Sequence, residues 1–522
     1  MKIAQRRALR VFRKIFVVIF AAIIIVGMTG CSKNKSTGTT SKSVTLYWWR
    51  SVDDAPQATL TEMVTSFMQD NPNITIKLRL KNPTTLEEEA RNALAAYKTT
   101  PDAPDIISLP AEEIPDMAQS LVPFPDNYFD TGSTKTGKSA AEYIASLFEP
   151  GAAKAVILND PKSGRAFVYG LPIAIDTLSL FVNTDLIQQS ADNLKTTQKT
   201  NTQLTDEQVR TITKQLQAAP KTWKDLTDVV PYLRTVQGDQ VIKAAIAMGA
   251  SINVERSYDI LSTIMMQNGT QMTSKALDQA TFNLVQAGAV NSTNPGERAL
   301  AFYMQFSNPK SPLYTWNNQM PNSVEAFKSG QLVMMFHYAS AYRSIIQTTP
   351  SLKSKIQIYP VPQLTTPDSP NAAASIKTME RMLVECATSA KNDPSNNIRS
   401  NASMKFIQYM TMNRTGSKAY LKAMQLPSAL KQDPTQTTSS DSAFVQQTTI
   451  ADGWYKGKDA LGVDVIFITM INGVSQGQDR QQALDAAARD VTTILQGSSY
   501  KWGTAQRTNS QTTDNATATN GQ

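Results

Sequence analysis

The fold is decided by residues 44–80, which read VTLYWWRSVDDAPQATLTEMVTSFMQDNPNITIKLRL. Residues 44–49 are rich in β-branched and aromatic side chains, and residues 74–80 alternate between apolar and polar ones, so both predict strands. Between them, apolar side chains recur at the helical spacing i, i+3, i+4, i+7: Leu60, Met63, Val64 and Phe67. A strand, a helix and a strand in this order predict a βαβ unit with a right-handed crossover.

The same alternation continues along the chain. Residues 84–97 predict a helix that Thr84 would open as the N-cap of a capping box with Glu87, and residues 104–109 predict a buried strand. Further strands are expected at 178–183, 244–248, 332–336 and 356–359, and further helices at 140–148, 222–235, 299–306, 401–412 and 484–495. This order predicts an α/β fold with mostly parallel sheets. The polar segment 188–220 is expected to be a surface insertion that carries one helix.

Composition excludes several functions. The chain has 522 residues, of which 41% are hydrophobic and 18% charged, as expected of about two or three folded domains. Much of its net charge of +8 comes from six basic side chains near the N-terminus: Lys2, Arg6, Arg7, Arg10, Arg13 and Lys14. The rest of the chain is close to neutral, which argues against a nucleic-acid partner. One histidine and two cysteines cannot build a His/Cys zinc site, so we expect no metal and no cofactor.

The amino terminus is typical of an export signal. Residues 15–28 are an uncharged run that is short for a membrane span and normal for a signal peptide. The run ends in Met28-Thr29-Gly30-Cys31, which resembles a bacterial lipobox and implies cleavage before Cys31 and a diacylglyceryl thioether on it. An uncleaved anchor is the alternative, because no charge occurs until Lys33. Both readings place the protein outside the cytoplasm at a membrane surface. Cys386 then lacks a disulfide partner and is expected to be a small buried hydrophobe.

Residues 132–139, GSTKTGKS, match the P-loop pattern. In a P-loop, Lys138 would reach the phosphates and Ser139 would hold Mg²⁺. The context does not fit, because the preceding residues 121–130 contain two prolines and several acidic or amide side chains and predict no buried strand. We interpret the segment as a polar loop whose Ser139 opens the helix at 140–148.

Several segments in the right order resemble one family. They are FMQDNPNI at 67–74, PDII at 104–107, YGLPIAIDTLSLFVN at 169–183, PKTW at 220–223 and FKSGQLVMM at 327–335. Together they resemble bacterial extracellular solute-binding proteins of the maltose/sugar-binding type (family 1), the receptor components of ABC importers. The resemblance covers residues 44 to 496.

The resemblance implies a periplasmic-binding-protein-like fold of two α/β lobes joined by a multi-segment hinge. The expected division is a signal peptide at 1–30, a tether at 31–43, lobe 1 at 44–173, lobe 2 at 174–372, a return to lobe 1 at 373–432, a C-terminal helical segment at 433–503 packing mainly on lobe 2, and a disordered tail at 504–522. It also implies a small-molecule solute, a carbohydrate in the first instance, bound between the lobes. The expected partners are the transmembrane subunits of a permease, and the protein is expected to be a monomer.

The resemblance also implies where solute contacts lie. Trp48 and Trp49 point to opposite faces of one strand, and we favour Trp49, next to Arg50, as a flat platform for a sugar ring. Acidic contacts are expected from Glu112, Glu113 and Asp176, although Asp176 alternatively makes a hinge-stabilising hydrogen bond. On the second lobe we expect Tyr258, His337, Tyr338 and Trp454. The family usually has a tryptophan near residue 338, so Tyr338 would replace it, and His337 alternatively serves a structural role.

Three functions remain open at this stage. The first is a lipid-anchored receptor that binds a carbohydrate, with a peptide, polyol or polyamine as alternative solute. The second is a surface enzyme, either a hydrolase or a P-loop ATPase, which we do not favour. The third is a scaffold or adhesin that uses the same two-lobed shape without transport.

Overall fold

The structure is a computed structural model that describes residues 43–130, 137–160, 163–200, 204–285, 294–365, 375–389, 397–431 and 443–497. The predicted signal peptide, the lipobox with Cys31, most of the tether, residues 132–136 of the P-loop match and the tail all lie outside the described residues. Two five-stranded sheets, each with its own hydrophobic core, organise the described part of the chain. We call the first sheet with its helices lobe 1 and the second lobe 2.

The sheet of lobe 1 has the strand order β2-β1-β3-β14-β6. The strands are β1 (Val44–Ser51), β2 (Ile74–Lys81), β3 (Ile106–Pro110), β14 (Leu383–Ala387) and β6 (Gly170–Pro172). Strand β1 pairs in parallel with β2, with Val44 opposite Ile74, and helix α2 (Gln57–Asp70) connects them. The βαβ unit predicted from residues 44–80 is therefore confirmed.

Six further helices belong to lobe 1: α3 (Leu86–Ala95), α4 (Ile114–Met117), α5 (Ala140–Leu147), α6 (Pro150–Val156), α15 (Ile398–Thr411) and α16 (Arg414–Met424). Ser139 caps α5 in a complete capping box with Glu142, so it opens this helix as predicted. The N-cap of α3 is Thr85, not Thr84, whose hydroxyl donates to Asn82 instead. A short hairpin of β4 (Ile157–Asn159) and β5 (Ala166–Val168) lies beside this lobe's helices.

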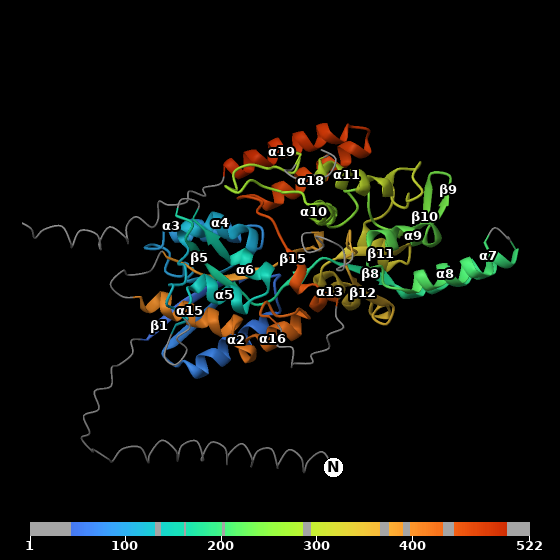
Figure 1. Ribbon diagram of the computed structural model, residues 1–522. Coiled ribbons are helices and arrows are strands. Elements are labelled where there is room, and N and C mark those ends of the chain that lie inside the picture. The colour runs from blue at the N-terminus through green and yellow to red at the C-terminus, as the bar shows by residue number, and fades with distance from the viewer. Residues whose placement is uncertain are drawn as a thin grey trace, which may run out of the picture. The chain divides into compact units, whose positions relative to one another are not determined.

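The sheet of lobe 2 has the order β12-β8-β11-β10-β9. Its strands are β8 (Ser179–Asn183), β9 (Thr235–Gln237), β10 (Gln240–Ile246), β11 (Leu332–His337) and β12 (Ile356–Pro360). Its helices include α9 (Trp223–Leu233), α10 (Ser257–Gln267), α11 (Pro295–Met304), α12 (Ser323–Lys328), α13 (Ala339–Thr348), α18 (Ala460–Ser475) and α19 (Arg480–Gln496). In Figure 1 the helices α2, α5 and α15 of lobe 1 lie at the lower left. The lobe 2 helices α9 and α10 lie to the upper right of them, and α19 runs along the top.

Both sheets are mixed rather than mostly parallel, which corrects the prediction. In lobe 1, β14 runs antiparallel to both of its neighbours, β3 and β6. In lobe 2, β8 runs antiparallel to both β11 and β12. The reason is that these strands are the places where the chain enters or returns to a lobe. Such a strand arrives from the other lobe rather than through a crossover helix, so nothing forces it to be parallel.

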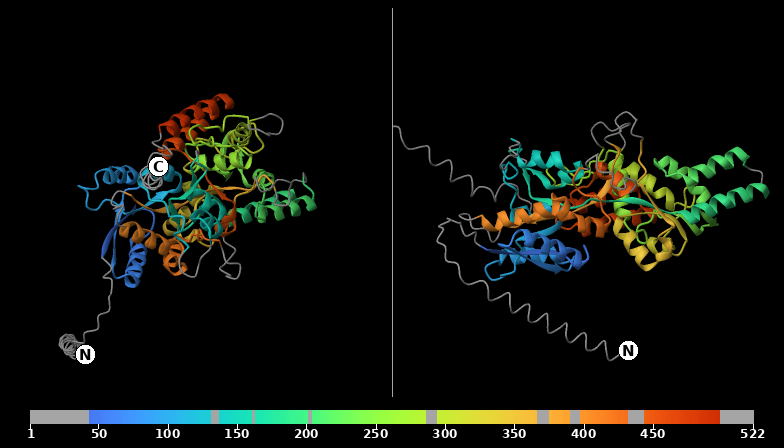
Figure 2. Two further views of the ribbon diagram at one scale, coloured as in Figure 1. Left: turned by 60° about the vertical axis from the view of Figure 1, so that its left-hand side comes forward. Right: turned by 90° about the horizontal axis from the view of Figure 1, so that it is seen from below.

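The insertion at 188–220 carries two helices, whereas the sequence predicted one. Helix α7 (Thr184–Thr200) continues directly from β8, and α8 (Asp206–Gln217) begins at Thr205, which forms a capping box with Gln208. The two helices lie side by side and extend away from the sheet of lobe 2 (Figure 1 and the right view of Figure 2). The prediction missed α7 because its second half is polar and offers little apolar periodicity.

A three-stranded sheet, β15-β13-β7, lies where the chain passes between the two cores. It is formed by β7 (Asp176–Thr177), β13 (Thr378–Arg381) and β15 (Ala451–Asp452). Gln447, which is fully buried, donates from Nε2 to Thr177 Oγ1, Leu178 O and Ser179 Oγ at 2.8–3.2 Å and accepts from Val361 N at 2.7 Å. The side-chain amide of Gln447 therefore links residues 177–179, where the chain first passes between the cores, to Val361, which follows β12. The exact lobe boundaries stay a prediction.

A buried ion cluster fixes the return strand in lobe 1. The guanidinium of Arg50 is fully buried and pairs with Asp54 and with Glu385 of β14, which is also fully buried. Glu385 Oε2 also accepts hydrogen bonds from Trp48 Nε1 at 3.0 Å and Ser108 Oγ at 2.7 Å. Arg50 donates further to Tyr420 Oη at 3.0 Å. The cluster thus ties β1, β3, β14 and α16 together.

Replacing Arg50 by methionine should lower the free energy of unfolding by about 3–5 kcal/mol, because it leaves buried carboxylates without their cation. Arg79→Met is the matched control, since Arg79 and its partner Asp102 are both more than 40% exposed and 3.5 Å apart. That change should cost less than about 1 kcal/mol. Urea unfolding measures both, and equal losses in the two variants would contradict this role of Arg50.

Candidate functional site

A cleft of about 760 Å³ opens between the two lobes. Lobe 1 lines it with the short turn after β3 and with residues of α6 and β4, and lobe 2 lines it with the start of α10 and part of α18. The strand β13 and residues 452–456, which follow β15, complete the lining. A solute in this cleft would touch both lobes, as the resemblance implied.

Three carboxyl groups on the lobe 1 and hinge side of the cleft form no ion pair among the described residues. Glu112 and Glu113 follow β3 directly, because Pro110 ends that strand and a turn begins at Ala111. Glu380 lies on β13 and is only 9% exposed, and its Oε2 has no hydrogen-bond partner in the described part of the chain. Burial, together with nearby Glu112, raises the pKa of Glu380 well above its usual value, and burial does the same for Glu113.

Aromatic side chains and a buried lysine form the lobe 2 side. Trp454 and Tyr258 are half-buried, and the Lys456 ammonium lies 5.3 Å from the Tyr258 ring centroid and 5.8 Å from that of Trp454. Lys456 is 5% exposed and pairs with Asp464 at 2.6 Å and, more loosely, with Asp259 at 3.8 Å. Burial alone would lower the pKa of Lys456, but Asp259 and Asp464 raise it. The lysine is therefore held in its charged form.

Three polar contacts hold β15 and the residues after it in place. Tyr455, which follows Trp454, donates its hydroxyl to Asp116 Oδ2 of α4 at 2.9 Å. Asp452 pairs with Lys377 at 2.6 Å and with Lys154 of α6. These contacts place the residues after β15 against lobe 1, while Trp454 packs against the core of lobe 2.

The structure brings four of the nine predicted solute contacts together in this cleft: Glu112, Glu113, Tyr258 and Trp454. Their contact with a solute stays a prediction. Trp49 and Arg50 do not line the cleft, which corrects their placement. Trp49 is 3% exposed, donates to Asp102 O at 2.9 Å and lies under Lys81, whose Nζ is 3.9 Å from the ring centroid. Both faces of β1 are covered, so neither of its tryptophans can act as a platform.

The remaining three predicted residues lie near the hinge and do not line the cleft. His337 Nδ1 accepts from Tyr338 N at 2.8 Å, so its Nε2 donates to Glu255 Oε2 at 3.0 Å. Tyr338 is fully buried and donates its hydroxyl to Asp259 Oδ2 at 3.1 Å. Asp176 Oδ1 accepts from Ala339 N, the first residue of α13, at 3.0 Å, which is the hinge-stabilising alternative. Burial raises the pKa of Asp176 to about 6.

Sequence reasoning missed several charged side chains of the cleft. They are Lys154, Arg256, Asp259, Lys377, Glu380, Arg381, Asp452, Lys456 and Asp464. For Asp452 and Lys456 a signal existed, because they flank the predicted Trp454. For Glu380 and Arg381 none did, since their place depends on the pairing of β13 with β7 and β15, which are far away in the sequence.

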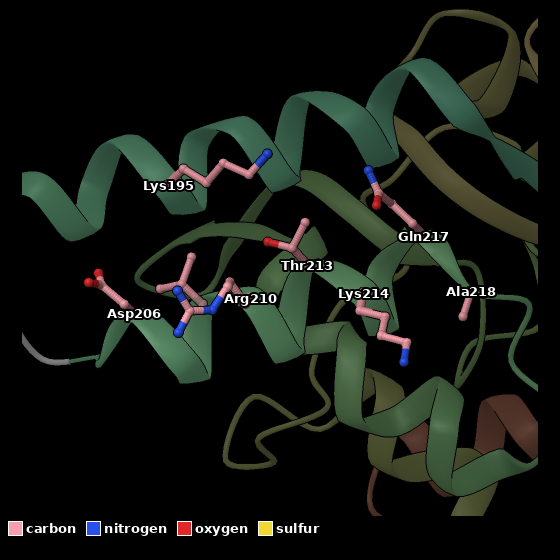
Figure 3. Close-up of a pocket in the computed structure, with 8 residues that line it drawn as sticks. Lys195, Asp206, Arg210, Thr213, Lys214, Gln217 and Ala218 are labelled. Carbon is pink, nitrogen blue, oxygen red and sulfur yellow. The ribbon is translucent and has the colours of Figure 1, made fainter.

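A second hollow, of about 600 Å³, lies on the α7–α8 hairpin (Figure 3). It is lined by Lys195, Asp206, Val209, Arg210, Thr213, Lys214, Gln217 and Ala218. This lining contains no aromatic side chain, and only the two helices of one hairpin contribute to it. A solute there would contact one lobe only, so we assign the candidate site to the interlobe cleft.

A sequence profile of the family described as "Bacterial extracellular solute-binding protein" matches residues 62–448. The chain belongs to this family of bacterial extracellular solute-binding proteins. No curated protein sequence matches the chain significantly.

Solved structures share the fold at low sequence identity. The sugar-binding protein MalE from Xanthomonas citri is 17% identical, with a TM-score of 0.63 over 87% of this chain and 97% of that chain. The cyclic alpha-maltosyl-1,6-maltose binding protein from Arthrobacter globiformis is 15% identical, with a TM-score of 0.62 over 87% and 99%. The GacH receptor of Streptomyces glaucescens is 16% identical, with a TM-score of 0.57 over 87% and 97%. The predicted periplasmic-binding-protein-like fold is confirmed.

Among the described residues, no helix has the length and apolar character that a membrane span requires.

The raised pKa of Glu380 makes stability depend on pH. A carboxyl held neutral in the folded state favours folding at low pH, and this contribution is lost as the pH rises, because the unfolded state then ionises freely. Glu380→Gln mimics the neutral acid, so it should raise the free energy of unfolding at pH 7.5 and change it little at pH 4. Urea unfolding at both pH values measures this, with exposed Glu325→Gln as control. If Glu380→Gln raised the free energy of unfolding equally at both pH values, or no more than Glu325→Gln does, the raised pKa of Glu380 would be refuted.

Proposed function

We propose that the protein is an extracytoplasmic receptor that binds a carbohydrate in the interlobe cleft and releases it unaltered to an ABC permease. The single observation that carries the proposal is the cleft itself, where lobe 1 offers carboxyl groups and lobe 2 offers Trp454 and Tyr258. Carboxyl groups, whether neutral or ionised, form hydrogen bonds with sugar hydroxyls, and aromatic rings pack against the apolar faces of sugar rings. The family membership supports a binding role rather than catalysis.

The solved neighbours support a carbohydrate rather than another solute. They include a sugar-binding protein, a cyclic maltosyl-maltose binding protein and a cyclo/maltodextrin-binding protein complexed with maltotetraose. A peptide, polyol or polyamine remains the alternative solute for this chain.

Closure of the two lobes would provide the mechanism. A solute that touches both walls of the cleft binds the closed arrangement better than the open one, and it shifts the population by that difference in affinity. The three hinge strands and the buried amide of Gln447 are positioned to absorb the motion, because they lie where the chain passes between the cores.

Saccharide binding should be detectable as thermal stabilisation of the purified chain. A saccharide at 100 times its Kd stabilises the folded state by about 2.7 kcal/mol. We expect such a shift with at least one member of a panel of neutral, acidic and amino oligosaccharides. Trp454→Ala should weaken the binding of that saccharide about tenfold through loss of ring packing.

The matched control is Tyr232→Ala, which removes an exposed aromatic side chain of α9 outside the cleft and should leave the affinity unchanged. A shift with dipeptides or polyamines and none with any saccharide would overturn the carbohydrate proposal. Conversion of the added saccharide into a product would overturn the receptor role.

We also propose that Cys31 carries the lipid that anchors the protein, on the basis of the sequence Met28-Thr29-Gly30-Cys31. In a bacterial host fed a clickable palmitate analogue, the wild-type chain should become labelled and Cys31→Ser should lose the label. Cys386→Ser is the control and should keep it, because Cys386 is buried in lobe 1. Equal labelling of wild type and Cys31→Ser would refute the anchor.

A further inference from the structure

The basic side chains that line the cleft fall into two groups. Lys154 and Lys377 pair with Asp452, and Lys456 pairs with Asp464 and Asp259. Arg256 and Arg381 form no ion pair with any carboxylate of the described residues, and exposed Lys275 at the cleft also forms none. The two arginines are therefore cations of the cleft that form no ion pair in the described part of the chain.

Arg256 and Arg381 converge on one aromatic ring. Their guanidinium carbons lie 5.6 and 5.3 Å from the ring centroid of buried Tyr338, so the two groups are no farther apart than these distances combined. Arg256 also donates to Tyr258 Oη at 2.7 Å. Several carboxylates lie close enough to interact with these arginines: Asp176 with both, Asp259 and Glu112 with Arg381, and Glu255 with Arg256. None of them forms an ion pair with either guanidinium group, and Asp176 Oδ1 accepts from Ala339 N. These cation–π contacts and the hydrogen bond to Tyr258 leave most of the N–H donors of the two guanidinium groups without a partner among the described residues.

The backbone at Arg256 supports a functional role. It adopts φ 63° and ψ 21°, the left-handed conformation that bulky residues avoid, at the N-cap of α10. Glycine would adopt this conformation without strain, and asparagine with little. An arginine that stays there against this cost points to a use for its side chain, because strained residues cluster at ligand sites. The positive end of the α10 helix dipole adds to the positive potential around the Arg256 guanidinium.

The carboxyl groups of the cleft would favour a cationic ligand, in contrast to the arginines. Glu112, Glu113 and Glu380 also form no ion pair among the described residues, and as carboxylates they would attract a cationic ligand. However, burial raises the pKa of Glu113 and Glu380 well above the usual value, which favours their neutral acids. Arginine keeps its charge at every pH relevant to the cell. The two guanidinium groups, which converge on the Tyr338 ring and form no ion pair among the described residues, therefore favour an anionic ligand beside them.

We propose that the cleft selects an acidic saccharide, whose carboxylate pairs with Arg256 and Arg381. This inference rests on the carbohydrate-binding function proposed above and specifies its solute class. The planar fork of each guanidinium matches a carboxylate and can bind it through two parallel hydrogen bonds. Trp454 and Tyr258 would pack against the sugar rings beside the charged group.

Calorimetric titration with matched ligands tests this. We expect trigalacturonate to bind at least about tenfold more tightly than its methyl-esterified form, which has the same rings without the charge, since a charge-assisted hydrogen bond contributes at least this much. Its affinity should also fall as salt is added. Arg381→Gln and Arg256→Gly should each weaken trigalacturonate binding about tenfold or more, and Arg381→Lys should weaken it less than Arg381→Gln.

Arg256→Gly provides a second readout that a merely structural arginine would not give. Glycine relaxes the left-handed backbone, so the Tm of this variant should not fall although its acidic ligand is lost. Arg210→Gln is the control for loss of a guanidinium elsewhere, because Arg210 lies on α8 at the hollow of Figure 3 and should not affect binding.

The outcomes separate the two proposals. Equal affinity for trigalacturonate and its methyl ester, or tight binding of maltotetraose alone, would overturn the acidic-saccharide inference and leave the carbohydrate receptor intact. Preference for a glucosamine trimer would show that the carboxyl groups, not the arginines, select the solute, and would also overturn it. Binding of none of these saccharides would overturn the inference and count against the proposed function itself.

Discussion

The buried pairing of Arg50 with Glu385 is the constraint on which the two-lobed arrangement depends. The two residues are 335 positions apart in the chain, and both are removed from solvent. Glu385 belongs to the strand that returns from lobe 2, so its charge is satisfied only when β14 lies between β3 and β6. A shifted register would leave a buried charge alone, which is far more costly than a lost surface contact. The segments that pass between the lobes are held in place as a consequence, and with them the walls of the cleft.

The walls of the cleft differ in how their charges are arranged. At β15 and just after it the lysines are paired with aspartates: Lys154 and Lys377 share Asp452, and Lys456 pairs with Asp464. Near Tyr338, two arginines share one aromatic ring and lack a carboxylate in contact. A neutral surface tolerates many hydrated solutes, whereas two guanidinium groups without an ion-pair partner discriminate by charge. The asymmetry between these two regions is what distinguishes this cleft from a uniformly polar one.

Much of the fold could be predicted from local sequence signals, because the β1–α2–β2 unit, β8, β11 and α15 carry clear periodicity and turn residues. The mixed direction of the sheets could not, since β14 and β8 owe their direction to the route of the chain between lobes. In the site, side chains next to a predicted strand end, such as Glu112, were found near the cleft. Trp49 was not found near the cleft. The alternation of side chains along a strand shows on which face of the sheet a residue lies, but it does not show whether a helix covers that face. Glu380 and Arg381 were missed because only long-range pairing places them.

The burial of Cys386 has a practical consequence for observing domain motion. The sequence contains only one other cysteine, Cys31, in the lipobox. Cys386 lies in strand β14 of the lobe 1 sheet and is fully buried, and burial raises the pKa of its thiol, so it reacts poorly with labelling reagents. A chain that starts after Cys31 therefore presents no reactive native thiol. Two engineered surface cysteines, one on α3 and one on α19, would accept a fluorophore or spin-label pair, and their separation would report opening and closing directly in solution.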